Sequence, residues 1–141
     1  MTTYLMPTME AGAALARRGI KGPVVMLNLL RLRDVADYSA TPELAPETPI
    51  SGRDAFDLYI AHTLPLLRDS GGELLFLGDG GAFLIGPPEE RWDLAMLVRQ
   101  HSVDRFLAFA QDEAIMAGIG HRTAAIKDAR LLPLVETGLA G

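Results

Sequence analysis

Tyr59 and His62 lie three residues apart in a segment whose apolar residues follow the helical period, so their side chains are neighbours on one helix face. A neutral histidine can act as a general base near neutral pH, and a tyrosine hydroxyl can orient a phenol or an enol. Both residues are also common at the edge of a core, where tyrosine keeps its hydroxyl in water. The pair is therefore a catalytic candidate, with a structural role as the alternative.

Two polar side chains, Asn28 and Arg31, interrupt the apolar run of residues 24–32. Burying an unpaired amide or guanidinium is costly, so each must find a partner or face a wet cavity. Either could line a ligand pocket. Alternatively, Asn28 satisfies nearby backbone groups and Arg31 pairs with a carboxylate across a dimer. Because an odd number of positions separates them, they lie on opposite faces of a strand and would not share one site within one subunit.

Further cationic or titratable groups lie near the ends of their elements, where they could hold a carboxylate or enolate oxygen. We favour Arg122 among them, because it follows Gly118 and Gly120, which let the backbone approach a ligand closely. The catalytic candidates are thus Asn28, Tyr59, His62 and Arg122. The ligand-binding candidates are Arg31, Arg99, His101 and His121.

Most familiar site motifs are absent from the sequence. It contains no cysteine, which excludes a thiolate nucleophile, a thiolate metal site and a disulfide. Residues 78–83 begin like a dinucleotide-binding loop, but Phe83 replaces the third glycine and a strand follows instead of a helix. The three histidines lie in separate elements, so a metal site would need them to converge with carboxylates in space. No Gly-x-Ser-x-Gly motif occurs. We predict no cofactor and no metal.

The composition is that of one globular domain. The chain has 141 residues, 49% of them apolar and 22% charged, and a net charge of −5. Basic residues are scattered, which argues against nucleic-acid binding. No apolar stretch approaches the ~20 residues that span a bilayer, and no signal peptide is evident, so we expect a cytoplasmic protein that inserts in no membrane. The mean hydropathy of +0.18 is high for a monomer, which indicates extra apolar surface for a core or a partner.

The local patterns predict an α+β protein. In chain order we expect a helix over 8–18, a strand over 24–32, a long loop over 34–50, a helix from Ser51 to Gly71, apolar runs over 73–78 and 82–86, a strand over 93–100, a helix after Ser102, a helical stretch over 112–127 and a strand over 130–135. The two apolar runs are either a hairpin or one strand with a glycine bulge. Pro133 favours an edge position or a bulge for the last strand. This order is the ferredoxin-like βαββαβ arrangement, preceded by one extra helix.

The two predicted central strands are apolar on both faces. In the strand over 93–100, Leu94, Met96 and Val98 share one face, while Ala95 and Leu97 lie on the other. The helices of a ferredoxin-like domain cover only one face of the sheet. The simplest cover for the other face is a second copy of the sheet, so we predict a symmetric homodimer.

With this order of elements, the chain resembles the domain of unknown function 1330 family over roughly residues 23–135. The resemblance rests on distributed segments: Val25–Arg31, Pro49–Gly52, Tyr59, Gly71–Glu73, Trp92–Asp93, His121–Arg122 and Leu131–Pro133. It implies a dimeric α+β barrel, a superfamily that includes cofactor-independent monooxygenases, lactone isomerases and haem proteins similar to chlorite dismutase. The family itself has no established activity, so the resemblance implies a fold and no reaction.

Two functions fit these observations. The first is a cofactor-independent enzyme that performs proton transfer or monooxygenation on a small, oxygen-bearing, apolar substrate, with loop 34–50 as a lid. The second is a non-catalytic small-ligand-binding or assembly protein of the same fold. A binder or an enzyme needs an apolar pocket of roughly 300 Å³ or more with converging polar groups. We expect residues 1–22 to be an N-terminal helical extension and residues 23–141 to be the ferredoxin-like domain.

Overall fold

Two apolar segments form the central strands of an antiparallel sheet. They are β1 (Val24–Leu32) and β3 (Arg91–Gln100). The strand β2 (Glu73–Ala82) lies next to β3 at one edge, and β4 (Ile126–Leu134) lies next to β1 at the other. The strand order is therefore β2-β3-β1-β4. The helices are α1 (Met9–Arg17), α2 (Gly52–Asp69), α3 (Val103–Phe109), α4 (Glu113–Met116) and α5 (Ile119–Ala125), with a short 3₁₀ helix at Pro42–Leu44. This computed structural model describes residues 2–138, so the predicted outer domain limits, residues 1 and 141, lie outside it.

The order and pairing of these elements confirm the predicted ferredoxin-like α+β fold with an extra helix in front. Side-chain caps define where the helices begin. Thr8 Oγ1 accepts from the amide of Ala11 at 3.0 Å before α1, and Ser51 Oγ accepts from the amide of Asp54 at 3.0 Å before α2. Pro133 lies in β4 at the edge of the sheet, as predicted.

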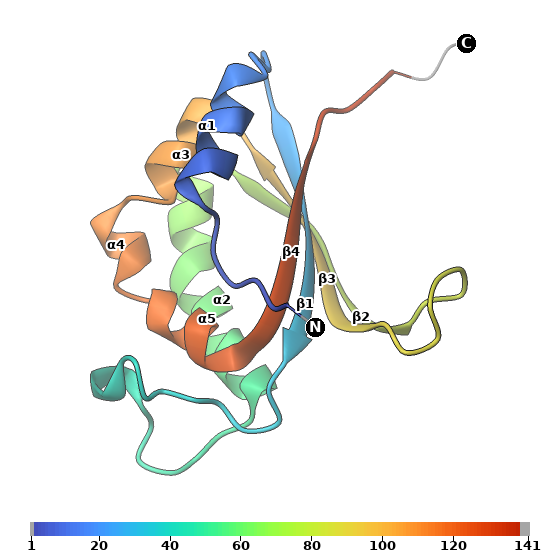
Figure 1. Cartoon of the computed structure of the whole chain (residues 1–141). Coiled ribbons are helices and arrows are strands. Elements are labelled where there is room, and N and C mark those ends of the chain that lie inside the picture. The colour runs from blue at the N-terminus through green and yellow to red at the C-terminus, as the bar shows by residue number, and fades with distance from the viewer. Residues whose placement is uncertain (1, 139–141) are drawn as a thin grey trace.

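The helices lie on one side of the sheet and build the core against it (Figure 1). Leu30 of β1 pairs in register with Leu94 of β3, and both are nearly fully buried beneath Phe56 of α2. A second cluster joins the extra helix to the sheet, because Leu15 of α1 packs with Val24 and its neighbours. The N-terminal helix therefore extends the same hydrophobic layer.

The opposite face of the sheet is apolar and bare of helices (Figure 1). Its centre is formed by Leu27 and Leu29 of β1, which pair in register with Leu97 and Ala95 of β3. On the flanking strands, Phe76 is 56% exposed and Leu132 is 53% exposed. We call this surface the open face. It confirms that the central strands are apolar on both sides, while one chain covers only one of them.

Several element boundaries differ from the predicted ones, most of all around residues 73–86 and 112–130. Residues 73–82 form one strand whose bulge falls between Leu74 and Phe76, and residues 82–86 do not form a separate strand. A Cβ at Gly80 would overlap the carbonyl oxygen of Trp92. Because glycine has no Cβ, β2 can approach β3 closely here and the ladder continues through the glycines. The helical stretch over 112–127 divides at Gly118, and β4 begins at Ile126, whose side chain is fully buried in the core.

Replacing Gly52 by alanine should destabilise the protein. Its amide donates to the carbonyl of Arg33 at 3.1 Å, and an added Cβ would overlap the carbonyl oxygens of Arg33 and Ala125. Backbone atoms at this junction cannot give way without shifting α2, so we expect Gly52→Ala to lower the free energy of unfolding by about 1–3 kcal/mol.

Gly12 in α1 is the matched control, because a Cβ there meets nothing within 4 Å. Gly12→Ala should raise the free energy of unfolding by about 0.5–1 kcal/mol through helix propensity. Urea denaturation measures both variants, and similar effects at the two positions would contradict the close approach at Gly52.

Candidate functional site

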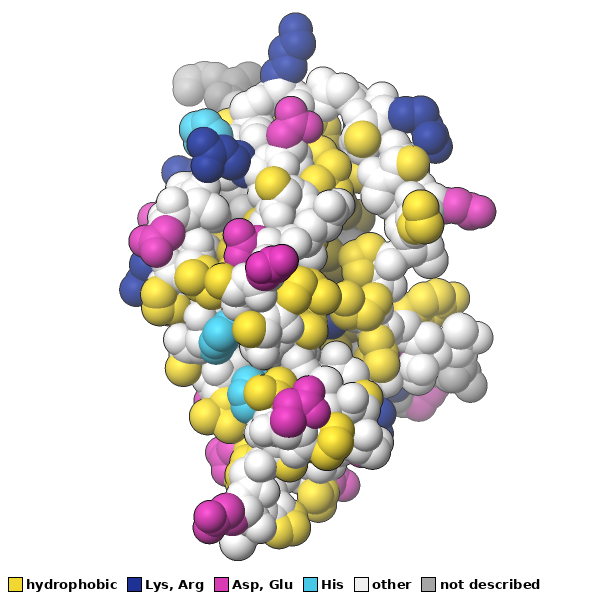
Figure 2. Space-filling view, turned by 90° about the vertical axis from the view of Figure 1, so that its left-hand side faces the viewer, with side chains coloured by type: hydrophobic (Ala, Val, Ile, Leu, Met, Phe, Trp, Pro, Cys, Tyr) yellow, Lys and Arg dark blue, Asp and Glu magenta, His cyan; other side chains and the backbone are white. Residues whose placement is uncertain are grey.

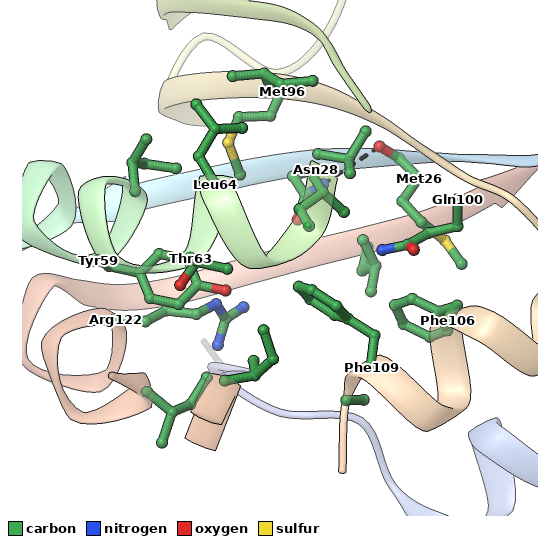
Figure 3. A pocket seen from close by; sticks show the side chains of 18 of the residues that line it. Met26, Asn28, Tyr59, Thr63, Leu64, Met96, Gln100, Phe106, Phe109 and Arg122 are labelled. Carbon is green, nitrogen blue, oxygen red and sulfur yellow. Dashed lines mark hydrogen bonds between the residues drawn. The ribbon is translucent and has the colours of Figure 1, made fainter. Parts of the chain in front are cut away.

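A cavity of about 170 Å³ lies between α2 and the helix side of the sheet. Its walls come from all four strands, α2, the segments of α3 to α5, and Met6 and Pro7, which precede α1 (Figure 3). Most of the wall is apolar, with side chains that include Met26, Met96, Leu64, Phe106 and Phe109. Seen from the helix side, apolar side chains also gather along the middle of the molecular surface (Figure 2).

The volume is smaller than the roughly 300 Å³ that we expected of a ligand pocket. It is nevertheless large enough for a small ring, because an engineered apolar cavity of about 150 Å³ in another protein binds benzene. The cavity therefore suits a ligand of one ring with small substituents.

One end of the cavity carries a cluster of polar groups on α2 and α5. Tyr59 and Thr63 lie one turn apart on α2, and Arg122 approaches them from α5 (Figure 3). Burial raises the pKa of Tyr59, although the charge of Arg122 and the nearby Thr63 hydroxyl act in the opposite direction. The Tyr59 hydroxyl is therefore protonated at neutral pH and can donate a hydrogen bond. Thr63 Oγ1 is buried and makes no hydrogen bond within the described chain.

Arg122 brings a positive charge into these apolar surroundings. Its Nη1 donates to the carbonyl of Leu5 at 2.7 Å and lies 3.5 Å from the sulfur of Met6. Burial lowers the pKa of Arg122, and neighbouring Tyr59 acts in the opposite direction. No carboxylate among residues 2–138 forms a salt bridge with this guanidinium. Its charge therefore has no protein counterion in the described part of the chain.

Two amides add polarity elsewhere in the wall. Asn28 of β1 uses its Nδ2 to donate to the carbonyl of Met26 at 3.2 Å. Gln100, the last residue of β3, is 2% exposed, and its Oε1 has no hydrogen-bond partner among the described residues. Figure 3 shows Gln100 on the far side of Phe109 from Arg122. The wall thus carries polar groups at two separated positions with apolar side chains between them.

The segment Tyr4–Pro7, which we call the strap, begins beside the outer edge of β4 and leads from there to the helix side and α1 (Figure 1). The amide of Tyr4 donates to Asp128 Oδ1 at 2.9 Å, and the amide of Ala129 donates to the Tyr4 carbonyl at 2.7 Å. Arg130 donates to the same Asp128 oxygen at 2.6 Å, and its guanidinium lies 4.9 Å from the centre of the Tyr4 ring. These contacts hold Met6 and Pro7 in the cavity wall.

Three of the four catalytic candidates therefore line one cavity: Asn28, Tyr59 and Arg122. His62 does not, because its ring turns toward α4, where Nε2 lies 2.7 Å from the carbonyl oxygen of Ala114. Gly118 packs so closely on this ring that a Cβ at that position would overlap it. His62 thus contacts the helices beside the cavity.

None of the four ligand-binding candidates lines the cavity. Arg31 donates to the carbonyl of Arg91 at 2.6 Å and stacks over Trp92, 4.8 Å from its ring centre. Arg99 lies 3.7 Å from a carboxylate oxygen of Glu73, and His101 is exposed at the end of β3. The separation of Asn28 from Arg31 agrees with their opposite strand faces. The proposed ligand roles of these residues stay predictions.

His121, the fourth, contacts loop 34–50. Its Nδ1 lies 2.8 Å from the hydroxyl of buried Tyr38, and the amide of Asp37 donates to the carbonyl of Ala124 at 2.9 Å. Burial is the main reason why the pKa of His121 is lowered and why the pKa of Tyr38 is raised. No residue of 34–50 is in the cavity wall, so the segment that covers the cavity is the strap.

Sequence reasoning did not single out Thr63, Gln100 or the strap. The signal for Thr63 was present, because it is a polar residue within the apolar stripe of α2, as Asn28 is within β1. Gln100 is likewise a polar residue in an otherwise apolar segment, at the end of β3. The strap gave no signal, because its position depends on the distant carboxylate of Asp128. Among residues 2–138, no group of three His, Asp or Glu residues could hold a metal ion, and no helix is long and apolar enough to cross a membrane.

The hydrogen bonds to Asp128 should make the stability of the strap depend on pH. Burial acts to raise the pKa of Asp128, but hydrogen bonds from Tyr4, Arg130 and Ala129 outweigh it, so this pKa lies below 3.8. A carboxylate whose pKa is lowered by folding stabilises the fold above its unfolded-state pKa, and this contribution is lost as the pH falls. Asp128→Asn removes the charge and keeps the shape. We expect a loss of about 1–3 kcal/mol of unfolding free energy at neutral pH.

The difference between the native protein and Asp128→Asn should shrink as the pH falls below about 4, because the carboxyl of the unfolded chain takes up a proton there, and it should be lost once the native carboxyl is neutral as well. Urea denaturation at several pH values measures this difference. A gap that stays constant from neutral to acidic pH would contradict the role assigned to the carboxylate.

The chain is similar to solved structures over nearly its whole length. Two crystal structures of RPA0582, described as a protein of unknown function from Rhodopseudomonas palustris, match it with a TM-score of 0.85. The methylated form is 31% identical and the match covers 98% of each chain; the other is 30% identical, covering 98% of this chain and 100% of that one. A dimeric, ferredoxin-like protein of unknown function from Bacteroides fragilis is 13% identical over 79% of this chain and 94% of its own, with a TM-score of 0.49. No protein-family model matches the chain. No curated protein is significantly similar to it.

Proposed function

The chain belongs to the family of the Rhodopseudomonas palustris protein RPA0582, and we propose that it binds a small, largely apolar, oxygen-bearing molecule between α2 and the sheet. The observation that carries this proposal is the polar cluster of Tyr59, Thr63 and Arg122 at one end of an otherwise apolar cavity. In most small-molecule sites, apolar walls supply the affinity and a few polar groups fix the orientation of the ligand.

The observed groups support binding more directly than catalysis. No histidine, aspartate or glutamate lines the cavity among the described residues, so nothing in the wall would take a proton from carbon at neutral pH. Tyr59 is protonated and Arg122 is cationic, and both would stabilise an oxygen that carries negative charge. Cofactor-independent proton transfer or monooxygenation therefore stays a prediction, and it would require a substrate that ionises without help from a protein base.

We further propose that the protein is a homodimer joined through the open face. The support is the apolar surface formed by Leu27, Leu29 and Leu97 with exposed Phe76 and Leu132. A stable interface buries about 800 Å² on each partner, and one face of a four-stranded sheet is of this order. Such a pair would be a dimeric α+β barrel. Membership of the domain of unknown function 1330 family, a cytoplasmic location and the division into an extension (1–22) and a domain (23–141) also stay predictions.

Binding should depend on Tyr59 but not on His62, although the two are neighbours on α2. In Tyr59→Phe, an oxygen-bearing ligand loses one hydrogen bond, and we expect about 3- to 10-fold weaker binding. In His62→Ala, binding should be unchanged, while loss of the contact to Ala114 should lower the free energy of unfolding by about 1 kcal/mol.

The measurement is isothermal titration calorimetry with hits from a thermal-shift screen of aromatic acids, lactones and quinols. If His62→Ala abolishes binding while Tyr59→Phe leaves it intact, the site does not lie in this cavity. If no small ring compound binds the native protein, the proposed function is wrong.

Dimerisation should be sensitive to charge on the open face and insensitive to charge on the helix side. Leu132→Glu places a carboxylate in the proposed interface, whereas Leu58→Glu makes the same change at a residue of α2 that is 42% exposed. We expect the first variant to sediment as a monomer and the second as the native dimer, because burying an unpaired charge is strongly unfavourable. A native protein that sediments as a monomer would contradict the proposal.

A further inference from the structure

Arg122 requires a counter-charge that the described protein does not supply. The guanidinium uses Nη1 on the carbonyl of Leu5 and the sulfur of Met6, both of which are neutral partners. A cation in apolar surroundings without a counterion is costly, so a bound anion would be stabilised at this end of the cavity. The hydroxyl groups of Tyr59 and Thr63 face the same place and can donate to an anionic oxygen (Figure 3).

The charge and size of the site favour a monocarboxylate. Arg122 is the one cationic residue in the cavity wall formed by the described residues, so a single negative charge neutralises it. The protein as a whole carries a net charge of −5, which disfavours the approach of polyanions. A planar carboxylate also matches the planar guanidinium, which binds its two oxygens in parallel.

The middle of the cavity suits a planar ring. Phe106 and Phe109 of the α3 segment face the methionines Met26 and Met96 of the sheet across it. Aromatic side chains contact other rings through stacked or edge-on arrangements, and thioether sulfurs make favourable contacts with aromatic rings. The volume of about 170 Å³ is enough for one ring.

The far end of the cavity offers an unsatisfied amide oxygen. Gln100 is 2% exposed, and its Oε1 is buried without a hydrogen-bond partner among the described residues. A buried acceptor without a partner is unfavourable. A ligand hydroxyl would satisfy this oxygen by donating a hydrogen bond to it.

We propose that the ligand is a hydroxylated aromatic monocarboxylate, with its carboxylate on Arg122, Tyr59 and Thr63 and its hydroxyl on Gln100. This inference rests on the proposed binding function and adds the chemical class of the ligand. It also gives the strap a role, because Leu5 and Met6 hold Arg122 in position at the carboxylate end.

The test compares benzoate with benzamide, its neutral counterpart of nearly equal shape, by isothermal titration calorimetry. Benzoate should bind the native protein about 10- to 100-fold more tightly, because it makes charge-assisted hydrogen bonds that benzamide cannot make. Arg122→Met should remove this preference. Arg122→Lys, which keeps the charge, should keep part of it. The comparison on the native protein stands even if Arg122→Met fails to fold.

The second arm compares 3- and 4-hydroxybenzoate with benzoate. The better isomer should bind about 3- to 10-fold more tightly than benzoate. This gain should vanish in Gln100→Leu, which replaces a buried amide by an apolar side chain of similar size. A gain that persists in Gln100→Leu, or no gain in the native protein, would overturn the hydroxyl assignment.

The outcomes separate this inference from the proposed function. If benzamide and benzoate bind equally well, the cavity binds small rings but the assignment of an anion to Arg122 is wrong. If neither compound nor any hydroxybenzoate binds, both the inference and the proposed function are wrong.

Discussion

The arrangement of this protein follows from two central strands that are apolar on both faces. Helices of one chain can cover only one face of a ferredoxin-like sheet, so Leu30 and Leu94 are buried under α2 while Leu27, Leu29 and Leu97 remain on the open face. The covered side therefore holds the core and the cavity. The open side carries the proposed dimer contact, and an assembly through it would not disturb the polar groups of the cavity.

The cavity exists because the helix layer is built from several short pieces. The second helical unit is divided among α3, α4 and α5, and it does not pack continuously along α2. Its pieces bring Phe106, Phe109 and Arg122 to the cavity wall, and the strap closes the remaining side. Asp128 and Arg122 hold that strap through its backbone, so groups that determine the fold also shape the site.

Much of this architecture could be predicted from local patterns. The bounds of β1, the Ser51 cap of α2 and the edge position of β4 follow from apolar runs, capping residues and a proline. The position of a polar residue in an apolar run made Asn28 a candidate site residue, and helical spacing did the same for Tyr59; both line the cavity. The sequence did not predict which way His62 turns, since its contact with Ala114 joins separate helices. Nor did it predict the strap, which is held by residues more than a hundred positions away.

The charge of Arg122 faces a cavity that we propose to be open to a small anion. The most direct measurement is a crystal structure of the protein soaked with 4-bromobenzoate, whose bromine can be located by anomalous scattering. Our account predicts a carboxylate within hydrogen-bond distance of Arg122, with the ring beside Phe109 and the bromine toward Gln100. An empty cavity in a crystal that holds the compound elsewhere, or a compound bound with its carboxylate away from Arg122, would contradict it.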